Sequence, residues 1–287
     1  MPYTEHFITV ADGLRIFARD YPATGAAHGL PVVCLHGLTR NSADFDSLAP
    51  AIAAGGRRVL ALDMRGRGRS DADPDPRRYR IDVYAADVLA VLDQLGVDRA
   101  VFIGTSMGGL MTMMISAMAE PRVAAAILND IGPVVDPAGL KRIAGYVGKT
   151  GPFDSWAAFI DAIKGTQSAA FPDADEALWR EFARRTGRED ANGKVTFNYD
   201  PAIAQAFNAP TPSPAPDLMP LFAPLATKPV LVVRGALSDI LAPAGVEAMR
   251  ATKPDLQLAE IPRIGHAPTL DEPAARLAIE TFLGRVD

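Results

Sequence analysis

The sequence predicts an α/β protein whose mostly parallel, twisted sheet carries helices on both faces. Four short segments in its first half are apolar at nearly every position, as strands buried on both faces of a parallel sheet are. Segments of helical period lie between them, and such an alternation is typical of α/β folds. The alternation breaks after Asp130 and resumes near residue 223, which predicts a segment inserted into one large α/β core.

The expected strands begin with an antiparallel pair, residues 6–10 and 14–21, on either side of the turn "ADG". Six further strands are expected in the parallel part of the sheet. They are 31–37, 57–63, 100–104 and 123–130 before the insertion, and 229–235 and 256–261 after it.

The expected helices follow from apolar residues that recur on one face. In residues 81–96, Val88 and Leu92 share such a face and Gly96 supplies the stop. Ser42 is expected to cap a helix over 42–54. The remaining expected helices are 108–119, one near 242–251 and one from Pro273.

The insertion, residues 133–222, has helical patterns but no clear strand–helix–strand unit. It holds both tryptophans and ends in the proline-rich stretch 209–217, which is expected to be a stiff linker. We therefore expect a core of residues 1–132 and 223–287, with 133–222 as a helical cap, or lid, over the sheet.

Composition narrows the class of protein. The 287 residues are 48% hydrophobic and 22% charged, as in an ordinary soluble globule. A net charge of −5 with scattered basic residues argues against nucleic acid and membranes as partners. The single cysteine, Cys34, excludes an internal disulfide. Without a visible secretion signal, and with its longest apolar run at 110–119 too short to span a bilayer, the protein is expected to be cytoplasmic. Nothing predicts its oligomeric state.

One serine lies in a setting that favours a nucleophile. The segment "GTSMG" at 104–108 follows an expected strand and precedes an expected helix, the context that a G-x-S-x-G elbow requires. Gly104 and Gly108 remove Cβ atoms where strand and helix crowd each other. Ser106 is therefore the expected nucleophile, and the alternative is a plain turn with an incidental serine.

A serine hydroxyl needs a neighbouring base. The chain offers four histidines, of which His6 and His28 are expected at the surface and His36 ends a strand. His266 follows the last strand in a loop that can reach over the carboxyl edge of the sheet, where open α/β sheets bind ligands. His266 is therefore the expected base.

A carboxylate is expected to hold the imidazole in its tautomer. Asp239 follows the strand 229–235 by a short loop and is the favoured choice. Asp130, at the end of 123–130, is the rival, with a capping role at the start of the insertion as its alternative. On this assignment, Asp130→Asn is expected to leave most of the activity.

The order Ser106, Asp239, His266 is that of the α/β-hydrolase superfamily, which the chain resembles over nearly its whole length. It is most similar to cap-bearing bacterial serine hydrolases, a group that includes carboxylesterases, enol-lactonases, cofactor-free haloperoxidases and ring-cleavage C–C hydrolases. The matching segments are "LHGL" at 35–38, "DMRGRGRSD" at 63–71, "GTSMGG" at 104–109, "GALSDILAP" at 235–243 and "GHAPTLDEP" at 265–273.

The resemblance implies an oxyanion hole made by the backbone N–H groups of Leu38 and Met107, with His36 as a positioning residue below the turn. The stretch "RGRGRS" at 65–70 is interpreted as a turn, because it lacks the ending of a phosphate-binding loop. No cofactor is expected, and no cluster of His, Cys or carboxylates has the spacing of a metal site.

The expected function is hydrolysis of a small, largely apolar carboxylic ester or lactone through an acyl-enzyme on Ser106, with Trp156 and Trp179 as expected substrate contacts. Three alternatives stay open. They are a C–C bond hydrolase acting on a vinylogous diketone, haloperoxidase or perhydrolase side activity, and a ligand receptor that keeps the hydrolase fold.

Overall fold

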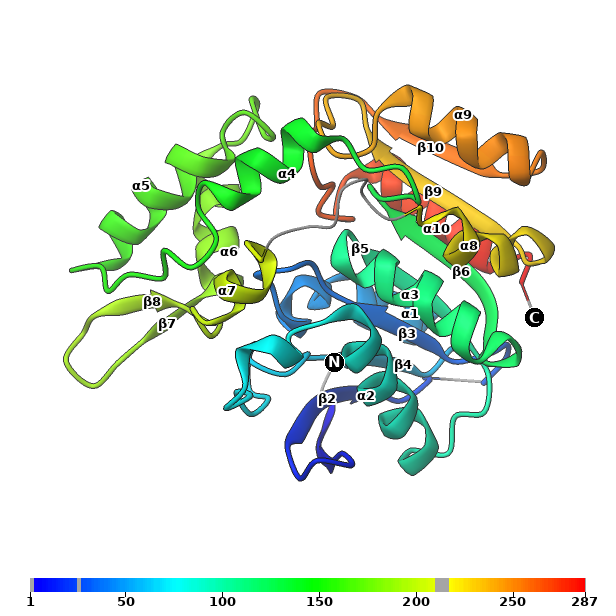
Figure 1. Ribbon diagram of the computed structural model, residues 1–287, viewed down its shortest axis with the longest axis horizontal. Coiled ribbons are helices and arrows are strands. Elements are labelled where there is room, and N and C mark those ends of the chain that lie inside the picture. The colour runs from blue at the N-terminus through cyan, green and yellow to red at the C-terminus, as the bar shows by residue number, and fades with distance from the viewer. Residues whose placement is uncertain (1–2, 25–26, 210–216, 287) are drawn as a thin grey trace.

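The computed structural model describes residues 3–24, 27–209 and 217–286, and in these a twisted eight-stranded sheet forms the centre (Figure 1). The strand order is β1-β2-β4-β3-β5-β6-β9-β10. β1, β2 and β4 pair antiparallel and all the other neighbours pair parallel. The strands are β1 (Thr4–Thr9), β2 (Arg15–Tyr21), β3 (Val32–Leu35), β4 (Val59–Leu62), β5 (Ala100–Thr105), β6 (Val123–Asn129), β9 (Val230–Gly235) and β10 (Gln257–Ile261).

Helices cover both faces of this sheet. α1 (Leu48–Ala54) and α10 (Pro273–Leu283) pack on one face. The other face is covered by α2 (Ile81–Gln94), α3 (Met107–Met118), α8 (Met219–Phe222) and α9 (Pro243–Thr252). Short 3₁₀ helices lie at η1 (Ser42–Phe45), η2 (Pro76–Arg78), η3 (Glu120–Arg122) and η4 (Ala223–Thr227). This architecture confirms the predicted fold class.

The central strands are apolar because both of their faces are covered. Every residue of β3, β4, β6 and β9 is buried. The helix expected over 42–54 is instead divided into η1 and α1, and its cap is Asn41, whose side chain accepts from the Ala43 N–H at 2.9 Å. Ser42 does not cap, because it is itself the first residue of η1, and its N–H donates to the buried carboxylate of Asp63 at 2.6 Å.

Between β6 and α8 the chain leaves the sheet and forms a separate layer, which we call the cap segment (133–209), drawn in green and yellow-green in Figure 1. It contains α4 (Pro137–Ala144), α5 (Trp156–Gln167), α6 (Glu176–Thr186), α7 (Ile203–Phe207) and a hairpin of β7 (Gly187–Glu189) and β8 (Val195–Phe197). The hairpin makes the segment less purely helical than the sequence predicts.

The cap segment has its own apolar cluster, built around Phe159, Phe171 and Trp179. α8 packs against α3, so it lies with the core and not with the cap layer. The linker predicted at 209–217 falls almost wholly outside the described residues. None of the helices in the described ranges has the length and apolar character that crossing a bilayer would need.

Candidate active site

Ser106 occupies a sharp turn between β5 and α3. Its φ of 51° lies in the left-handed region, which a serine adopts only under constraint. The two motif glycines allow the turn. A Cβ on Gly104 would lie 2.4 Å from the backbone of Gly108, and a Cβ on Gly108 would lie 2.0 Å from the Leu35 carbonyl oxygen. The elbow therefore lifts the serine hydroxyl above the carboxyl end of β5.

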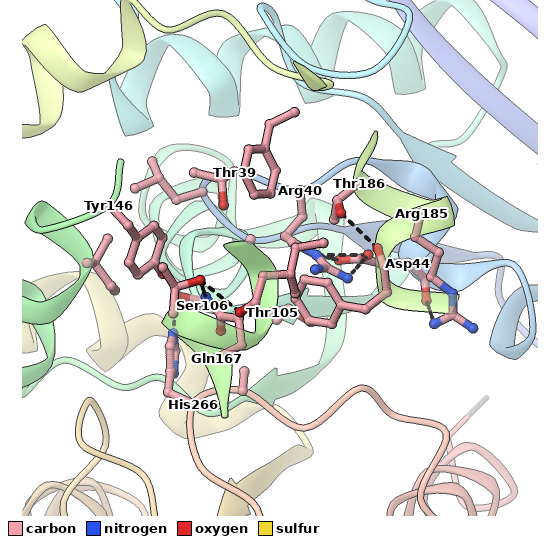
Figure 2. A pocket seen from close by; sticks show the side chains of 18 of the residues that line it. Thr39, Arg40, Asp44, Thr105, Ser106, Tyr146, Gln167, Arg185, Thr186 and His266 are labelled. Carbon is pink, nitrogen blue, oxygen red and sulfur yellow. Dashed lines mark hydrogen bonds and ion pairs between the residues drawn. The ribbon is translucent and has the colours of Figure 1, made fainter. Parts of the chain in front are cut away.

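A chain of hydrogen bonds runs from this hydroxyl into the protein. Ser106 Oγ lies 2.9 Å from His266 Nε2, and Figure 2 shows the imidazole directed at the serine. His266 Nδ1–H donates to Asp130 Oδ2 at 2.8 Å. Because the carboxylate can only accept, this contact leaves Nε2 free to take the serine proton.

Asp130 lies in a fixed, fully buried position. It follows β6 directly and adopts a φ of 56°. Its Oδ1 accepts from the Gly235 N–H at 2.8 Å, and its Oδ2 accepts from the Ser238 hydroxyl at 2.5 Å. These bonds hold the carboxylate against His266.

The prediction that Asp239 partners His266 is wrong. The Asp239 carboxylate turns to the cap segment and accepts two hydrogen bonds from Arg142 of α4, at 2.6 and 2.7 Å. Hydrogen bonding from Arg142 lowers the pKa of Asp239. The physical reason is topological: β6 lies beside β5 in the sheet, so the residue that ends β6 reaches the imidazole first. No local feature of the sequence shows that Arg142, 97 residues away, binds Asp239.

The two amides predicted for an oxyanion hole flank Ser106. Met107 is the first residue of α3, where helix geometry offers its N–H no acceptor. The Leu38 N–H makes no hydrogen bond within the described ranges. A Cβ on Gly37 would lie 3.9 Å from the Cβ of Ser106, so the peptide between Gly37 and Leu38 lies close to the nucleophile.

His36 fixes that peptide. Its Nε2 accepts from the Met64 N–H at 3.0 Å, so the proton is on Nδ1, which donates to the Gly37 carbonyl at 2.7 Å. The carbonyl and the Leu38 N–H belong to one rigid peptide plane. Burial lowers the pKa of His36 to about 4 and keeps the ring neutral in this role.

A cavity of about 350 Å³ opens between Ser106 and the cap segment. Its apolar lining includes Ile143, Phe153, Ile163, Phe171, Phe182 and Phe197. Neither predicted substrate contact belongs to the lining, so this prediction is wrong. Trp179 is buried in the apolar cluster of the cap segment, and Trp156 donates its indole N–H to Glu189 at 2.8 Å.

The charged residues of the lining are mostly paired. Arg40 binds Asp44 at 2.6 Å, and Arg185 binds Asp271 at 2.8 Å. Lys149, at the edge of the cavity, forms no ion pair with any described residue. The described residues include no group of three His, Cys, Asp or Glu side chains placed to bind a metal ion.

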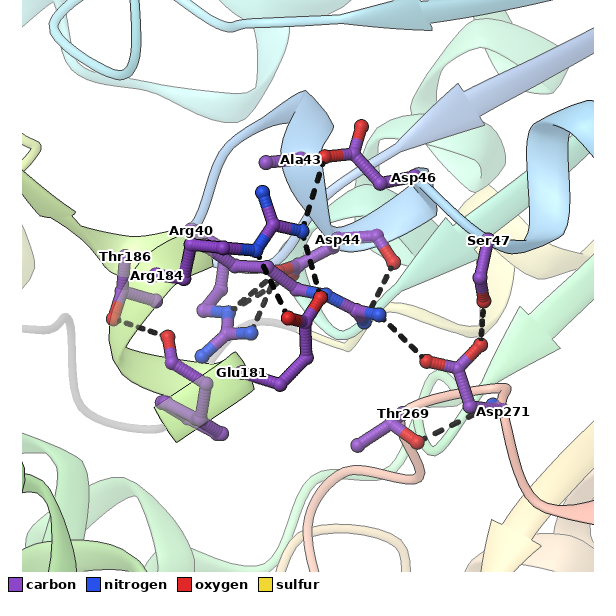
Figure 3. Close-up of polar contacts among 12 residues, drawn as sticks. Arg40, Ala43, Asp44, Asp46, Ser47, Glu181, Arg184, Thr186, Thr269 and Asp271 are labelled. Carbon is purple, nitrogen blue, oxygen red and sulfur yellow. Dashed lines mark hydrogen bonds and ion pairs between the residues drawn. The ribbon is translucent and has the colours of Figure 1, made fainter. Parts of the chain in front are cut away.

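Polar contacts join the end of α6 to two core loops (Figure 3). Arg185 donates to Asp271 in the loop after His266 and, at 3.3 Å, to the Asp44 carbonyl in η1. The Asn41 side chain donates to the Arg185 carbonyl at 2.8 Å. One cap residue thus connects the loop that carries the imidazole with the loop that follows Leu38.

Comparison with known proteins agrees with this fold. Residues 31–273 match the sequence family described as alpha/beta hydrolase fold. The chain is 35% identical over 263 residues to a 3-hydroxybutyrate-oligomer hydrolase of Cupriavidus necator, covering 88% of each protein. It is 36% identical over 196 residues to a non-heme haloperoxidase of Rhodococcus erythropolis, covering 66% of this chain and 65% of that one. A crystal structure of an alpha/beta hydrolase from Novosphingobium aromaticivorans superposes with a TM-score of 0.92 at 44% identity, covering 99% of both chains.

Proposed function

This chain belongs to the α/β-hydrolase family, and on that premise we propose that it is a serine hydrolase of small, largely apolar carboxylic esters or lactones. The observation that carries the proposal is the continuous hydrogen-bonded series from Ser106 through His266 to Asp130. In this proposal Asp130, not Asp239, is the acid of the triad.

The proposed reaction has two halves. Ser106 Oγ bonds to the acyl carbon while its proton passes to His266 Nε2, and the carbonyl electrons move onto oxygen. The N–H groups of Leu38 and Met107 stabilise that oxyanion, at roughly 3 to 4 kcal/mol per donor. When the intermediate collapses, the leaving oxygen takes the proton from His266.

Water then attacks the acyl-enzyme. His266 accepts a proton from the water, the oxyanion forms again in the same place, and Ser106 Oγ leaves with the proton that His266 returns. Asp130 stabilises the imidazolium in both halves.

The cavity lining and one of the relatives support an ester as the substrate. The apolar lining suits a short acyl or alkyl group. The Cupriavidus necator relative is named for oligomers of 3-hydroxybutyrate, whose units are joined by ester bonds. Esters of short hydroxy acids are therefore within the proposed substrate range.

Release of nitrophenol from 4-nitrophenyl butyrate tests the proposal. We expect steady turnover by the wild type and a loss of about 10⁴-fold or more in kcat for Ser106→Ala. A single burst followed by silence would instead favour a ligand receptor. Unchanged turnover in Ser106→Ala would overturn the proposal. As a control, the variant should unfold at the same temperature as the wild type.

A further inference from the structure

Arg67 is a buried cation that the proposed mechanism does not use. It lies in the "RGRGRS" turn after β4, and only 1% of its surface is exposed. No described carboxylate lies within ion-pairing distance of its guanidinium. Burying a charge without an opposite charge is costly, so this arrangement needs a physical reason.

The guanidinium gives its N–H groups to neutral acceptors. Nε donates to the Leu38 carbonyl at 2.9 Å, and one terminal nitrogen donates to the Tyr84 hydroxyl at 2.8 Å and to the Arg65 carbonyl at 2.9 Å. The other terminal nitrogen lies 3.5 Å from Met107 Sδ. The tyrosine ring also faces the cation, with its centroid 4.8 Å away.

Its neighbour in the same turn shows the contrast. Arg65 is equally buried, but it binds the carboxylates of Asp12, Asp73 and Asp87, at 2.8, 2.5 and 2.6 Å. These three carboxylates balance the charge of Arg65, which therefore has a structural role. Arg67 instead contacts Leu38 and Met107, the two residues whose amides flank Ser106.

The cap segment closes over this turn. The backbone of Arg67 forms a β-bridge with Tyr199, and the Gly68 N–H donates to the Asn198 carbonyl at 3.0 Å. Exclusion of water lowers the local dielectric, so a charge here acts more strongly on the site than a surface charge would.

Building on the proposed function, we propose that Arg67 is a positioning residue of the oxyanion hole whose uncompensated charge also stabilises the oxyanion. Through Leu38 and Met107 it holds both amide-bearing residues in place. The counter-charge that it lacks in the resting protein arrives when the tetrahedral intermediate forms.

Butylboronic acid provides the probe. Its boron forms a bond with Ser106 Oγ and becomes a tetrahedral anion, while the serine proton passes to His266 Nε2. By contrast, 1-butanol binds the same cavity without charge. We would measure the affinity for both, together with kcat and KM for 4-nitrophenyl butyrate, in the wild type, R67K and R67Q. R69Q is the matched control, because Arg69 belongs to the same turn but is exposed.

For R67Q we expect kcat and boronate affinity to fall together by about 100-fold, the lower end of the loss seen when a direct oxyanion donor is removed. KM and butanol affinity should change little, R67K should lie between, and R69Q should match the wild type. Equal boronate affinity in R67Q and wild type would overturn the proposal, and so would an equal loss for boronate and butanol. If R67Q does not fold, R67M replaces it with the same expected result.

The outcomes separate the two proposals. A wild type that hydrolyses the ester through Ser106, with R67Q equally active, removes only the role of Arg67. A wild type that neither hydrolyses the ester nor binds the boronate removes the proposed function, and the role of Arg67 with it.

Discussion

The carboxyl edge of the sheet and the cap segment above it are held by different kinds of contact. At the edge, backbone bonds fix the reactive positions: the Ser106 N–H donates to the Asn129 carbonyl at 2.9 Å, and the Asp130 N–H donates to the Val233 carbonyl at 2.7 Å. The cap segment is held by side chains, such as the Arg142 and Arg185 ion pairs and its aromatic cluster. Substitutions at the sheet edge should therefore change kcat, whereas substitutions in the cap segment should change substrate selectivity or stability.

The two aspartates give the largest expected effect. Asp130→Asn should lower kcat by about 10⁴-fold, because an amide facing His266 Nδ1 favours the wrong tautomer. Asp239→Asn weakens the ion pair with Arg142 of the cap segment and should change kcat less than about threefold. Ester hydrolysis by the two purified variants measures this.

The pair also provides its own control, since both substitutions convert one carboxylate into an amide. A crippled Asp239→Asn beside a nearly normal Asp130→Asn would contradict the assignment. Equal losses would indicate that both carboxylates act on His266.

This pair marks the limit of what the sequence could predict. Periodicity and the serine elbow predicted the sheet, the insertion, and the meeting of Ser106 with His266, because these depend on local patterns and on strand polarity. The choice between Asp130 and Asp239 depends on strand order and on which carboxylate a distant arginine binds, and neither is a local property. The prediction that Trp156 and Trp179 contact the substrate failed for a related reason. Helical spacing predicts that a side chain is buried, but it does not show whether that side chain lies in the core of the cap segment or in the wall of the cavity.

Arg185 tests the connection between the two regions. Arg185→Met should lower the free energy of unfolding by about 2 kcal/mol, because it removes a buried guanidinium that binds Glu181 and Asp271, while Asp271 keeps its ion pair with Arg276. The neighbouring Arg184, which is exposed, binds the same Glu181, so Arg184→Met should cost less than about 1 kcal/mol. Urea unfolding measures both, and equal costs would contradict a special role for Arg185.

Because His36 lies at the edge of the sheet and its pKa is lowered by burial, we expect it to make the free energy of unfolding depend on pH. Burial lowers its pKa to about 4, below an unfolded value of about 6.5. The unfolded chain therefore takes up the proton first, and the stabilisation that is complete above pH 6.5 is lost as the pH falls toward 4. Between pH 7 and pH 5 this amounts to about 2 kcal/mol.

His36→Gln can accept from Met64 and donate to Gly37 without titrating. Unfolding free energies measured at both pH values should therefore fall more steeply for the wild type than for this variant. Parallel slopes would show that the imidazole remains chargeable in the folded protein.

The smallest expected effect concerns the cavity wall. Phe182 lines the cavity and stacks on Arg40, whose guanidinium carbon lies 3.8 Å from the ring centre. Phe182→Leu lengthens the available space, so the ratio of kcat/KM for octanoate over butyrate esters should rise about tenfold, a typical value for reshaping an apolar pocket. Trp156→Phe keeps an aromatic ring away from the cavity and should leave that ratio unchanged. Because neither side chain belongs to the hydrogen-bonded series from Ser106 to Asp130, kcat for butyrate should change little in both variants. A loss of kcat in Phe182→Leu would mean that the cap segment also sets the geometry of the sheet edge.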